Sequence, residues 1–341
     1  MEKMGFGILG AARIAASALV PAIRKSANAR VVAVAARDGI RAAEFAAQHG
    51  IPKAYGSYQE MLADPEVEAV YNPLPNSLHL PWTLRALEAS KHVLCEKPLA
   101  LSAAEAERMD QAAQKAGLIL MEAFMYRFHP QIARALELVR SGALGGLRLI
   151  RPSFSFLLER PTDIRWVAAL GGGALYDVGC YCVTFSRLFA GREPLAVTGW
   201  SDLTPPDHPG GGGVDHSFVG VLDFGEGLRS VFDCSFTQPF RQRVELVEER
   251  GTVVIPEAWV PGRRGSSGPD EHGLEAPRLV VNGQEEVQPA ADSYQLMVEH
   301  FVRAARGQEP LRYPAEEAVR QMRVLDALYA SAKVGRAVQL G

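Results

Sequence analysis

Several classes of protein are excluded by what this 341-residue sequence has little of. It has only four cysteines, with no Cys-x-x-Cys pair among them, so we expect small buried thiols in a reducing compartment. No apolar run reaches ~18 residues, the length that a membrane-spanning helix needs. The first ten residues also lack the pattern of a signal peptide. We therefore expect a soluble, cytoplasmic protein without a membrane partner.

The sequence has no excess of charge of one sign. It contains 36 Lys and Arg against 39 Asp and Glu, for a formal net charge of -3. Such a chain offers no basic stripe to neutralise phosphates, so a nucleic acid is not expected as a partner. What is present is typical of a globular protein, with 48% hydrophobic and 22% charged residues. At roughly 150 residues per domain, the length predicts two domains.

Residues 1–124 alternate short apolar runs with Ala-rich stretches, a pattern that predicts repeated βα units and a doubly wound parallel sheet of the Rossmann type. Two stretches predict helices: Ser77–Ser90, and the stretch after Ser102, where Glu105 completes a capping box. The expected strands are Gly5–Leu9, Arg30–Ala36, Ala54–Tyr55, Val67–Asn72, His92–Glu96 and Leu118–Met121.

Residues 125–341 have a different pattern of apolar and polar residues, which predicts a second, α+β domain with an open and predominantly antiparallel sheet. Consecutive alternating runs follow one another without helices between them, and the turn Phe224–Gly227 supports a hairpin. The Gly- and Pro-rich stretch Pro256–Pro277 predicts a long mobile loop or a strand extension, and Asp292–Arg306 and Ala315–Val334 predict closing helices. The expected strands are Leu147–Leu158, Ala196–Leu203, His216–Phe224, Leu228–Gln238 and Gln242–Glu249.

The first expected strand runs into a variant of the dinucleotide fingerprint, with Gly10, Ala12 and Ala15 at the three glycine positions. Gly10 suits the tight turn, whereas the methyl group of Ala12 lies where the backbone should approach a pyrophosphate. The context favours cofactor binding, because a helix start directly after the strand can donate free N–H groups to phosphate. A simple βα turn is the alternative.

The second expected strand ends at Ala36, Arg37 and Asp38, the place that distinguishes NAD from NADP. Arg37 can pair with a 2'-phosphate, which favours NADP. A shift of one residue would instead place the Asp38 carboxylate at the ribose, so NAD remains an alternative. Arg37 can also be an ordinary arginine on a solvated helix start.

The fifth expected strand leads into Glu96, Lys97 and Pro98 at the carboxyl edge of the sheet, where open α/β folds hold their ligands. Pro98 disfavours the helical conformation for Lys97 and stops the strand, which restricts where the ammonium group points. A surface lysine is the ordinary alternative. We interpret Lys97 as a residue that takes part in chemistry.

The segment Leu170–Phe185 begins with three glycines and places Asp177 and Tyr181 four residues apart, on one face of an expected helix. A phenol has an unperturbed pKa near ~10, so it needs a neighbouring cation, such as Lys97, to exchange protons efficiently at neutral pH. The alternative is a Gly-rich helix start with a core tyrosine. From this segment alone, both interpretations remain open.

Five segments together resemble the Gfo/Idh/MocA oxidoreductases, named for glucose-fructose oxidoreductase and inositol dehydrogenase. The tyrosine at 181, where many members have histidine, resembles the branch of trans-dihydrodiol dehydrogenase, NADP-dependent D-xylose dehydrogenase and keto-sugar reductases. The segments are GILGAARIA from residue 7, YNPLPNSLH from residue 71, CEKPLAL from residue 95, MEAFMYRFHPQ from residue 121 and GGGALYDVGCYC from residue 171.

The resemblance implies a role for each matching residue. Lys97 would hydrogen-bond the reacting hydroxyl or carbonyl group, Tyr181 would exchange its proton, and Asp177 would orient the substrate or the tyrosine. Substrate contacts are implied for Glu122 and Arg127. Cofactor contacts are implied for Gly10, Ala12, Arg13, Ile14, Arg37, Asn72, Pro73, His79, Glu96, Lys97, Arg165 and Trp166.

These observations predict an oxidoreductase that transfers a hydride between NADP, or alternatively NAD, and a carbohydrate-like carbon. The alternative from another class is a regulatory or sensor protein that binds the cofactor without turnover. The uncovered face of the second sheet predicts a homodimer or homotetramer, as is common in the family. No metal is expected, because His79 and His129 lack metal-ligand spacing and can each cap or pack a helix.

Overall fold

The alternating pattern of the first 124 residues folds as a parallel sheet. The computed structural model describes residues 2–262 and 274–340. In this part of the chain, six strands pair in the order β3-β2-β1-β4-β5-β6, all in parallel. This order reverses direction at β1, as in the dinucleotide-binding doubly wound fold. The strands are β1 (Met4–Leu9), β2 (Ala29–Ala35), β3 (Lys53–Tyr55), β4 (Ala69–Asn72), β5 (His92–Cys95) and β6 (Leu120–Glu122).

Helices connect these strands, and local capping fixes where several of them begin. Ser102 accepts a hydrogen bond from the Glu105 N–H at 3.2 Å, as the capping box predicts. The Glu105 carboxylate differs from the expected pattern, because it accepts the N–H of Leu101 at 3.0 Å. The helical segments are η1 (Ala15–Leu19), α1 (Val20–Lys25), α2 (Gly39–Gln48), α3 (Tyr58–Leu62), η2 (Asn76–Leu78), α4 (His79–Glu88) and α5 (Ala103–Ala116).

The chain divides into two compact units. This division differs from the expected single boundary at residue 124, because the segment 292–319 returns to the first unit. Unit 1 contains residues 2–125 and 292–319, and unit 2 contains residues 126–262, 274–291 and 320–340. Helix α8 (Ser293–Ala305) belongs to unit 1 because it packs on the parallel sheet. The rings of Phe6 and Phe301 lie 5.7 Å apart, and the Asn28 side chain donates to the Glu299 carbonyl at 3.0 Å. These contacts join segments far apart in sequence.

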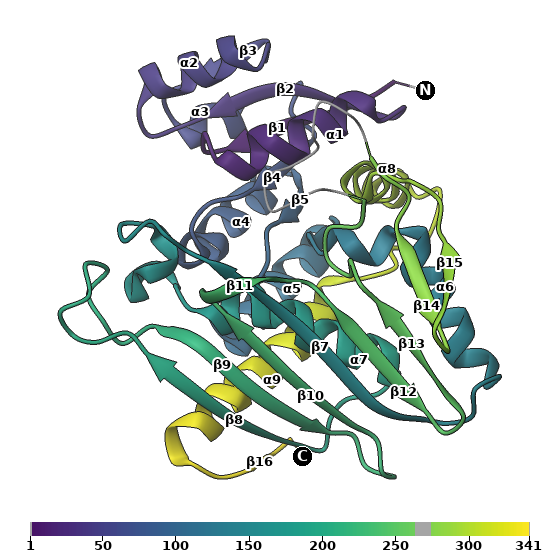
Figure 1. Cartoon of the computed structure of the whole chain (residues 1–341). Helices are drawn as coiled ribbons and strands as arrows, with labels where there is room; N and C mark the ends of the chain where they lie inside the picture. The colour runs from purple at the N-terminus through teal and green to yellow at the C-terminus, as the bar shows by residue number, and fades with distance from the viewer. Residues whose placement is uncertain (1, 263–273, 341) are drawn as a thin grey trace. The chain divides into compact units, whose positions relative to one another are not determined.

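Unit 2 is built on a second sheet, which in the described residues has ten strands. Along the main path they run β15-β14-β13-β12-β7-β10-β9-β8-β16, and β11 pairs with β7 (Figure 1). The strands are β7 (Leu147–Leu157), β8 (Ala196–Leu203), β9 (Asp215–Asp223), β10 (Arg229–Ser235), β11 (Thr237–Arg241), β12 (Val244–Glu248), β13 (Gly251–Ile255), β14 (Arg278–Val281), β15 (Gln284–Val287) and β16 (Val338–Gln339).

This sheet is mixed and predominantly antiparallel. The expected hairpin at Phe224–Gly227 joins β9 and β10, which pair antiparallel. The pair of β7 and β10 is parallel, because the chain returns to β7 only after passing through β8 and β9. The single strand expected over Leu228–Gln238 is wrong, since the chain breaks at Phe236 and β11 pairs with β7.

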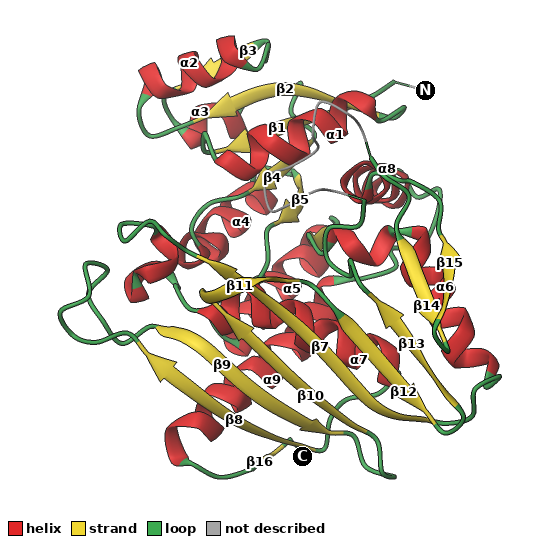
Figure 2. Ribbon diagram, viewed as in Figure 1, coloured by secondary structure: helices red, strands yellow, loops and turns green. Residues whose placement is uncertain are grey.

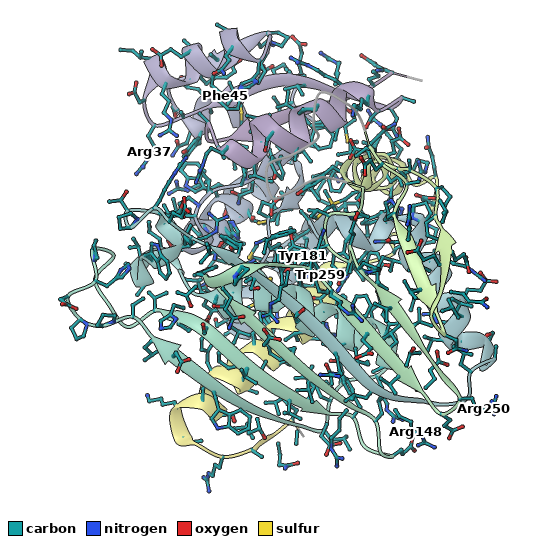
Figure 3. All side chains as sticks on the ribbon, viewed as in Figure 1. Arg37, Phe45, Arg148, Tyr181, Arg250 and Trp259 are labelled. Atoms are coloured by element: carbon teal, nitrogen blue, oxygen red, sulfur yellow. The ribbon has the colours of Figure 1, made fainter. Side chains whose placement is uncertain are left out.

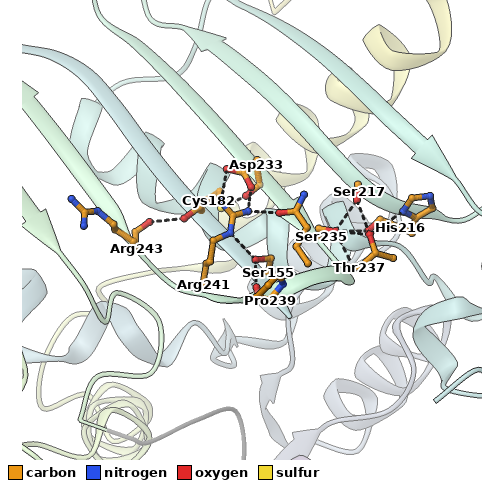
Figure 4. A network of polar contacts seen from close by, with 12 residues as sticks. Ser155, Cys182, His216, Ser217, Asp233, Ser235, Thr237, Pro239, Arg241 and Arg243 are labelled. Atoms are coloured by element: carbon orange, nitrogen blue, oxygen red, sulfur yellow. Dashed lines mark hydrogen bonds and ion pairs between the residues drawn. The ribbon is translucent and has the colours of Figure 1, made fainter. Parts of the chain in front are cut away.

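A polar network fastens β11 to the sheet. The Arg241 guanidinium is ion-paired with Asp233 on β10 and donates to the Ser155 hydroxyl on β7 at 3.0 Å (Figure 4). Ser217 and Ser235 are hydrogen-bonded at 2.7 Å in the same network. These contacts explain why β11 pairs with β7 and does not continue β10, because each side chain forms a hydrogen bond with a polar atom of a neighbouring strand.

One face of the second sheet is covered by α7 (Cys180–Ala190) and α9 (Ala315–Val334) (Figure 2). Phe218 on that face contacts Tyr329 of α9, with ring centroids 5.9 Å apart. The other face carries the exposed side chains of Trp200, Val219 and Val231. The remaining helical segments of unit 2 are η3 (Met125–Phe128), α6 (Pro130–Ser141), η4 (Ile164–Trp166), η5 (Ala168–Leu170) and η6 (Leu175–Gly179), η3 starting one residue before the unit.

Two further sequence expectations concern the rest of the chain. Half of the segment expected as a loop over Pro256–Pro277, residues 263–273, lies outside the described residues, and its described ends contain neither helix nor strand. Across the described residues, the helices are all too short or too polar to cross a membrane.

Candidate active site

The turn after β1 is tight and depends on a glycine. Gly10 has a φ of +91°, and its N–H donates to the Ala35 carbonyl of β2 at 2.7 Å. A Cβ atom at Gly10 would lie 3.0 Å from the Leu74 side chain, so glycine suits both the backbone and the space. Ile14 provides no side-chain cap for the helical segment that follows. The Ala16 N–H donates to the Ala12 carbonyl at 3.2 Å, so the backbone of the turn itself caps the start of this segment.

The end of β2 carries Arg37, whose exposed side chain projects from the edge of unit 1 (Figure 3). The Asp38 carboxylate is used differently, because it caps α2 by accepting the N–H groups of Ile40 and Arg41 at 2.9 and 3.4 Å. The shift that would place Asp38 at a ribose therefore competes with its role as a cap. This geometry favours Arg37 as the residue that distinguishes the cofactors.

Arg41 is a residue of this region that the sequence reasoning missed. Its guanidinium donates to the Ala11 carbonyl of the β1 turn at 3.1 Å. Burial raises the pKa of the nearby Tyr58, and the charges of Arg37 and Arg41 oppose that rise. The two arginines therefore act on the same phenol. The available signal was their spacing, four residues apart at the start of an expected helix.

The loop after β4 is organised by two buried polar side chains. Asn72 donates to the His79 carbonyl and the Thr83 hydroxyl, both at 3.3 Å. The two ring nitrogens of His79 lie 2.9 Å from the Pro98 carbonyl and 2.8 Å from the Leu74 carbonyl. Burial lowers the His79 pKa to about 4, so the ring is neutral at neutral pH. His79 thus ties the loop after β4 to the loop that contains Lys97.

The Lys97 loop is held at both ends. On one side, the Glu96 carboxylate accepts the hydroxyl of Tyr71 at 2.6 Å and the N–H of Lys97 at 3.3 Å. On the other side, the N–H of Leu99 donates to the buried carboxylate of Glu122 at 2.8 Å. The peptide bond that follows Lys97 is cis. These anchors fix the backbone that carries the ammonium group at the carboxyl edge of β5.

In unit 2, a glycine run leads into the segment that carries Tyr181. The Gly173 N–H donates to the Arg165 carbonyl at 3.1 Å, and a Cβ atom at Gly172 would lie 2.4 Å from that oxygen. The next residues differ from the regular helix that was expected, since η6 is π-helical and α7 begins only at Cys180. Such π segments occur frequently at functional sites.

The Asp177 carboxylate is paired within the same unit. Its Oδ2 lies 2.6 Å from Arg165 Nε, and Arg165 Nη1 lies 3.1 Å from Asp163 Oδ1. The charge of Asp177, together with that of Asp163, raises the pKa of the Arg165 guanidinium. Asp177 is therefore held by a cation at the start of the Tyr181 helix.

Tyr181 lies among aromatic side chains, at 6% exposure. Its ring centroid is 5.2 Å from Phe154, 5.7 Å from Trp259 and 5.8 Å from Tyr126. Figure 3 labels Tyr181 and Trp259. The Trp259 indole N–H donates to the Ser153 carbonyl at 3.0 Å, which fixes the orientation of the Trp259 ring beside Tyr181. Tight aromatic packing restricts the phenol to a narrow range of directions.

An open depression of about 530 Å³ lies close to this aromatic group on the surface of unit 2. Phe240 lines the depression and contacts Phe154, which in turn contacts Tyr181. The other lining residues are mostly polar: Ser153, Arg241, Gln242, Arg243, Pro256 and Glu257. The polar side chains of this lining can donate and accept hydrogen bonds.

Comparison with known proteins gives the family. Residues 4–124 match the model of the oxidoreductase family with an NAD-binding Rossmann fold. Residues 132–254 match the model of the GFO/IDH/MocA C-terminal domain. The chain belongs to the GFO/IDH/MocA oxidoreductase family. The predicted family and fold class are thereby confirmed, and so is the prediction of an oxidoreductase with a Rossmann domain that binds a nicotinamide cofactor.

Relatives of this GFO/IDH/MocA chain include enzymes of the expected branch. D-xylose 1-dehydrogenase (NADP(+)) 2 of Haloferax volcanii is 39% identical over 99% of this chain and 100% of its own length. The mouse trans-1,2-dihydrobenzene-1,2-diol dehydrogenase is 35% identical over 62% of each chain. The crystal structure of KijD10, a 3-ketoreductase from Actinomadura kijaniata in complex with NADP and TDP-benzene, has a TM-score of 0.87 at 29% identity, over 97% of this chain and 98% of that one.

Some of the expected site residues of this GFO/IDH/MocA protein are packed within unit 2. The Trp166 ring is 4% exposed and contacts His208 and Phe236, and its indole N–H donates to the Arg160 carbonyl at 3.0 Å. Arg127 is also buried. The cofactor contacts of Arg165 and Trp166 and the substrate contact of Arg127 stay predictions.

The histidines and cysteines contribute to structure. His129 caps α6 by accepting the Gln131 N–H at 3.1 Å, as one interpretation of the sequence predicts. All four cysteines are buried, and burial raises the thiol pKa of Cys95, Cys182 and Cys234. Within the described ranges, no group of three His, Cys, Asp or Glu side chains is arranged to hold a metal ion.

Proposed function

We propose that this protein is an NADP-dependent dehydrogenase or reductase that acts on a sugar, polyol, dihydrodiol or keto-sugar. The observation that carries the proposal lies in unit 1. Four features follow the carboxyl ends of strands in one parallel sheet: the Gly10 turn, Arg37, the 72–79 loop and Lys97. Nicotinamide dinucleotides bind at such an edge.

The residues of unit 1 fit this cofactor. The positive φ of Gly10 and the nearby Leu74 side chain favour glycine at this turn, and Ile14 provides no side-chain cap for the segment after it. Arg37 is exposed, and Arg41 lies against the same turn. Two guanidinium groups at this edge supply the charge-assisted hydrogen bonds that a 2'-phosphate prefers. When bound, the cofactor supplies or accepts the hydride.

The proton and the reacting oxygen are assigned to Tyr181 and Lys97. In oxidation, the carbinol C–H bond would break and its electron pair would pass as hydride to the oxidised cofactor, while the hydroxyl proton passes to the deprotonated Tyr181 oxygen and a C=O bond forms. Lys97 donates a hydrogen bond to the reacting oxygen and stabilises its developing negative charge. Reduction follows the same path in reverse, with Tyr181 as the proton donor. The ion pair with Arg165 holds the Asp177 carboxylate at the start of the Tyr181 helix.

Replacement of the phenol tests the assignment of Tyr181. We expect Tyr181→Phe to lower kcat for NADP-linked oxidation of aldoses such as D-xylose by about 100-fold or more, because proton transfer by a side chain contributes roughly 10²–10⁴-fold. NADPH binding, measured by nicotinamide fluorescence, should change less than about twofold. Tyr55→Phe removes a hydroxyl that donates to Asp64 in unit 1 and serves as the control, with unchanged kcat expected. Unchanged turnover in Tyr181→Phe would contradict the assignment, and NADPH binding without turnover on any polyol or ketose would favour the sensor interpretation.

Cofactor choice is tested separately at Arg37. We expect Arg37→Ala to weaken NADPH binding by about tenfold or more, since a hydrogen bond to a charged group contributes roughly 1.5–3 kcal/mol. NADH binding should stay within about twofold, because NADH lacks the 2'-phosphate. Arg30→Ala, near the opposite end of β2, is the matched control and should change neither affinity. Equal losses for NADPH and NADH would show that Arg37 does not read the 2'-phosphate.

We also propose that two copies of the chain associate through the outer face of the sheet in unit 2. Trp200 and Val219 are cross-strand partners on this face and are 57% and 44% exposed. Neighbouring exposed apolar side chains of this kind are typical of an interaction surface.

A further inference from the structure

A buried carboxylate outside the proposed chemistry supports the start of the Tyr181 helix. Asp215, the first residue of β9, is 3% exposed. Its Oδ2 accepts the Leu175 N–H at 2.7 Å, and its Oδ1 accepts the hydroxyl of Tyr329 from α9 at 2.9 Å. Three elements of unit 2 therefore meet at one carboxylate.

The helix start needs such a partner. The first N–H groups of a helical segment lack partners within it, and the side chain of Ala174 provides no cap for η6. Asp215 takes over this role from a distant strand. Gly173 belongs to the same arrangement, because its φ is +133° and a Cβ atom there would lie 2.3 Å from Asp215 Oδ1. The glycine run thus makes room for the carboxylate.

Tyr329 is fixed by its own packing. Its ring centroid lies 5.0 Å from that of Tyr176 on η6 and 5.9 Å from that of Phe218 on β9. Neither ring leaves the phenol free to turn away from Asp215, so its hydroxyl stays directed at the carboxylate. The hydrogen bond therefore depends on α9, which lies on the covered face of the sheet.

We propose that Asp215 and Tyr329 are positioning residues for Tyr181: the Asp215 carboxylate holds the first turn of the helical segment that carries the phenol, and Tyr329 holds the carboxylate. This inference rests on the proposed role of Tyr181. A shift of about 1 Å in a reacting group is enough to cost roughly 100-fold in rate, so the start of this helix is a place where a remote residue controls the reaction.

The carboxylate titrates in the neutral range. Burial raises the Asp215 pKa to about 7, and the hydrogen bonds from the Leu175 N–H and the Tyr329 hydroxyl oppose that rise. The titratable groups packed around it are Tyr329 with Tyr176 beside it, and Cys234 on β10. Burial raises the pKa of both Tyr329 and Cys234, so both are neutral at neutral pH. Protonation of Asp215 weakens its hold on the helix, and kcat should therefore fall as the pH drops below about 7.

The test uses Tyr329→Phe in the full chain, with Tyr55→Phe as the matched control, because Tyr55 also donates to an aspartate at 2.9 Å. We expect Tyr329→Phe to lower kcat about tenfold while the KM and the NADPH dissociation constant change less than about twofold. Amide hydrogen exchange over residues 172–184 should become about tenfold faster. The control should change neither the kcat nor this exchange.

A second variant addresses the titration. Asp215→Asn keeps an oxygen that can accept the Leu175 N–H but cannot ionise, so we expect it to retain more kcat than Asp215→Ala and to lose the dependence on pH near 7. Unchanged kcat and an unchanged pH profile in both Tyr329→Phe and Asp215→Asn would overturn the inference. If the Asp215 variants do not fold, hydrogen exchange of the unsubstituted protein decides, because the inference requires residues 172–184 to exchange faster below about pH 7 after correction for the intrinsic rate.

Failure of the proposed function gives a different result. Full turnover in Tyr181→Phe would remove the role of the phenol but would leave the exchange results at residues 172–184 as predicted. Loss of turnover in Tyr181→Phe together with normal turnover in Tyr329→Phe would remove only the positioning role.

Discussion

The Glu248 carboxylate of unit 2 is buried in an unfavourable environment, and removal of its charge should stabilise the protein. Glu248 is 4% exposed, and neither of its side-chain oxygens has a hydrogen-bond partner among the described residues. Burial raises its pKa. Because the folded pKa lies above the unfolded value, the folded state is favoured at low pH and loses this advantage as the pH rises through the folded pKa. We expect Glu248→Gln to raise the free energy of unfolding at pH 7 by about 1 kcal/mol.

The pH dependence separates this effect from a general change in packing. Near pH 4 the unsubstituted carboxyl is protonated as well, so the difference in urea midpoint between the two proteins should shrink. Glu245→Gln on the same strand is the control, because Glu245 is paired at 3.2 Å with Arg151, which is largely exposed, and should change stability by less than about 0.5 kcal/mol. A midpoint difference that is the same at both pH values would show that the Glu248 charge is not responsible.

Residues next to strand ends were predictable from the sequence, whereas residues that act across the fold were not. Gly10 and Lys97 follow expected strands, so the edge of the sheet on which they lie follows from the pattern. Asp215 and Tyr329 lie more than a hundred residues apart and meet only because β9 and α9 pack in the same unit. His79 shows the same limit, since its contacts with Leu74 and Pro98 join two loops.

At the scale of elements, local signals predicted position better than pairing. The helix over Ala315–Val334 and the strand over Ala196–Leu203 have the expected bounds. The parallel pair of β7 and β10 could not be derived from consecutive strands, because it depends on which strand becomes the neighbour of β7. The break between β10 and β11 depends on the Arg241 contacts with two other strands. Polar contacts between distant segments thus decide which strands pair, which the alternation of apolar and polar residues does not determine.

The π-helical segment before Tyr181 is a second limit at this scale. The spacing of Asp177 and Tyr181 predicts one regular helix, and the structure has a π turn followed by α7. A change in helical period alters the direction of every side chain after it. The contacts with Arg165 and Asp215, from other parts of the chain, accompany this change and are not visible in the local pattern.

At the scale of the whole molecule, the outer face of the sheet in unit 2 makes a prediction about assembly. Trp200, Val219 and Val231 come from three adjacent strands and are exposed on this face. A stable pair of chains buries about 800 Å² per partner, which a face of several strands can supply. We expect the protein to have at least twice the mass of one chain in sedimentation at micromolar concentration.

A charge placed in the centre of this face should separate the copies. We expect Val219→Arg to give a single-chain mass, because an arginine brought into a dry interface without a partner pays the cost of desolvation. NADPH binding should remain, since the Gly10 turn, Arg37 and Lys97 lie in unit 1 and Val219 is not among the expected cofactor contacts. Val334→Arg is the matched control, as Val334 is 55% exposed at the end of α9 and away from this face, and its mass should equal that of the unsubstituted protein. An unsubstituted protein that sediments as a single chain, or a Val219→Arg variant that stays associated, would exclude this face as the interface.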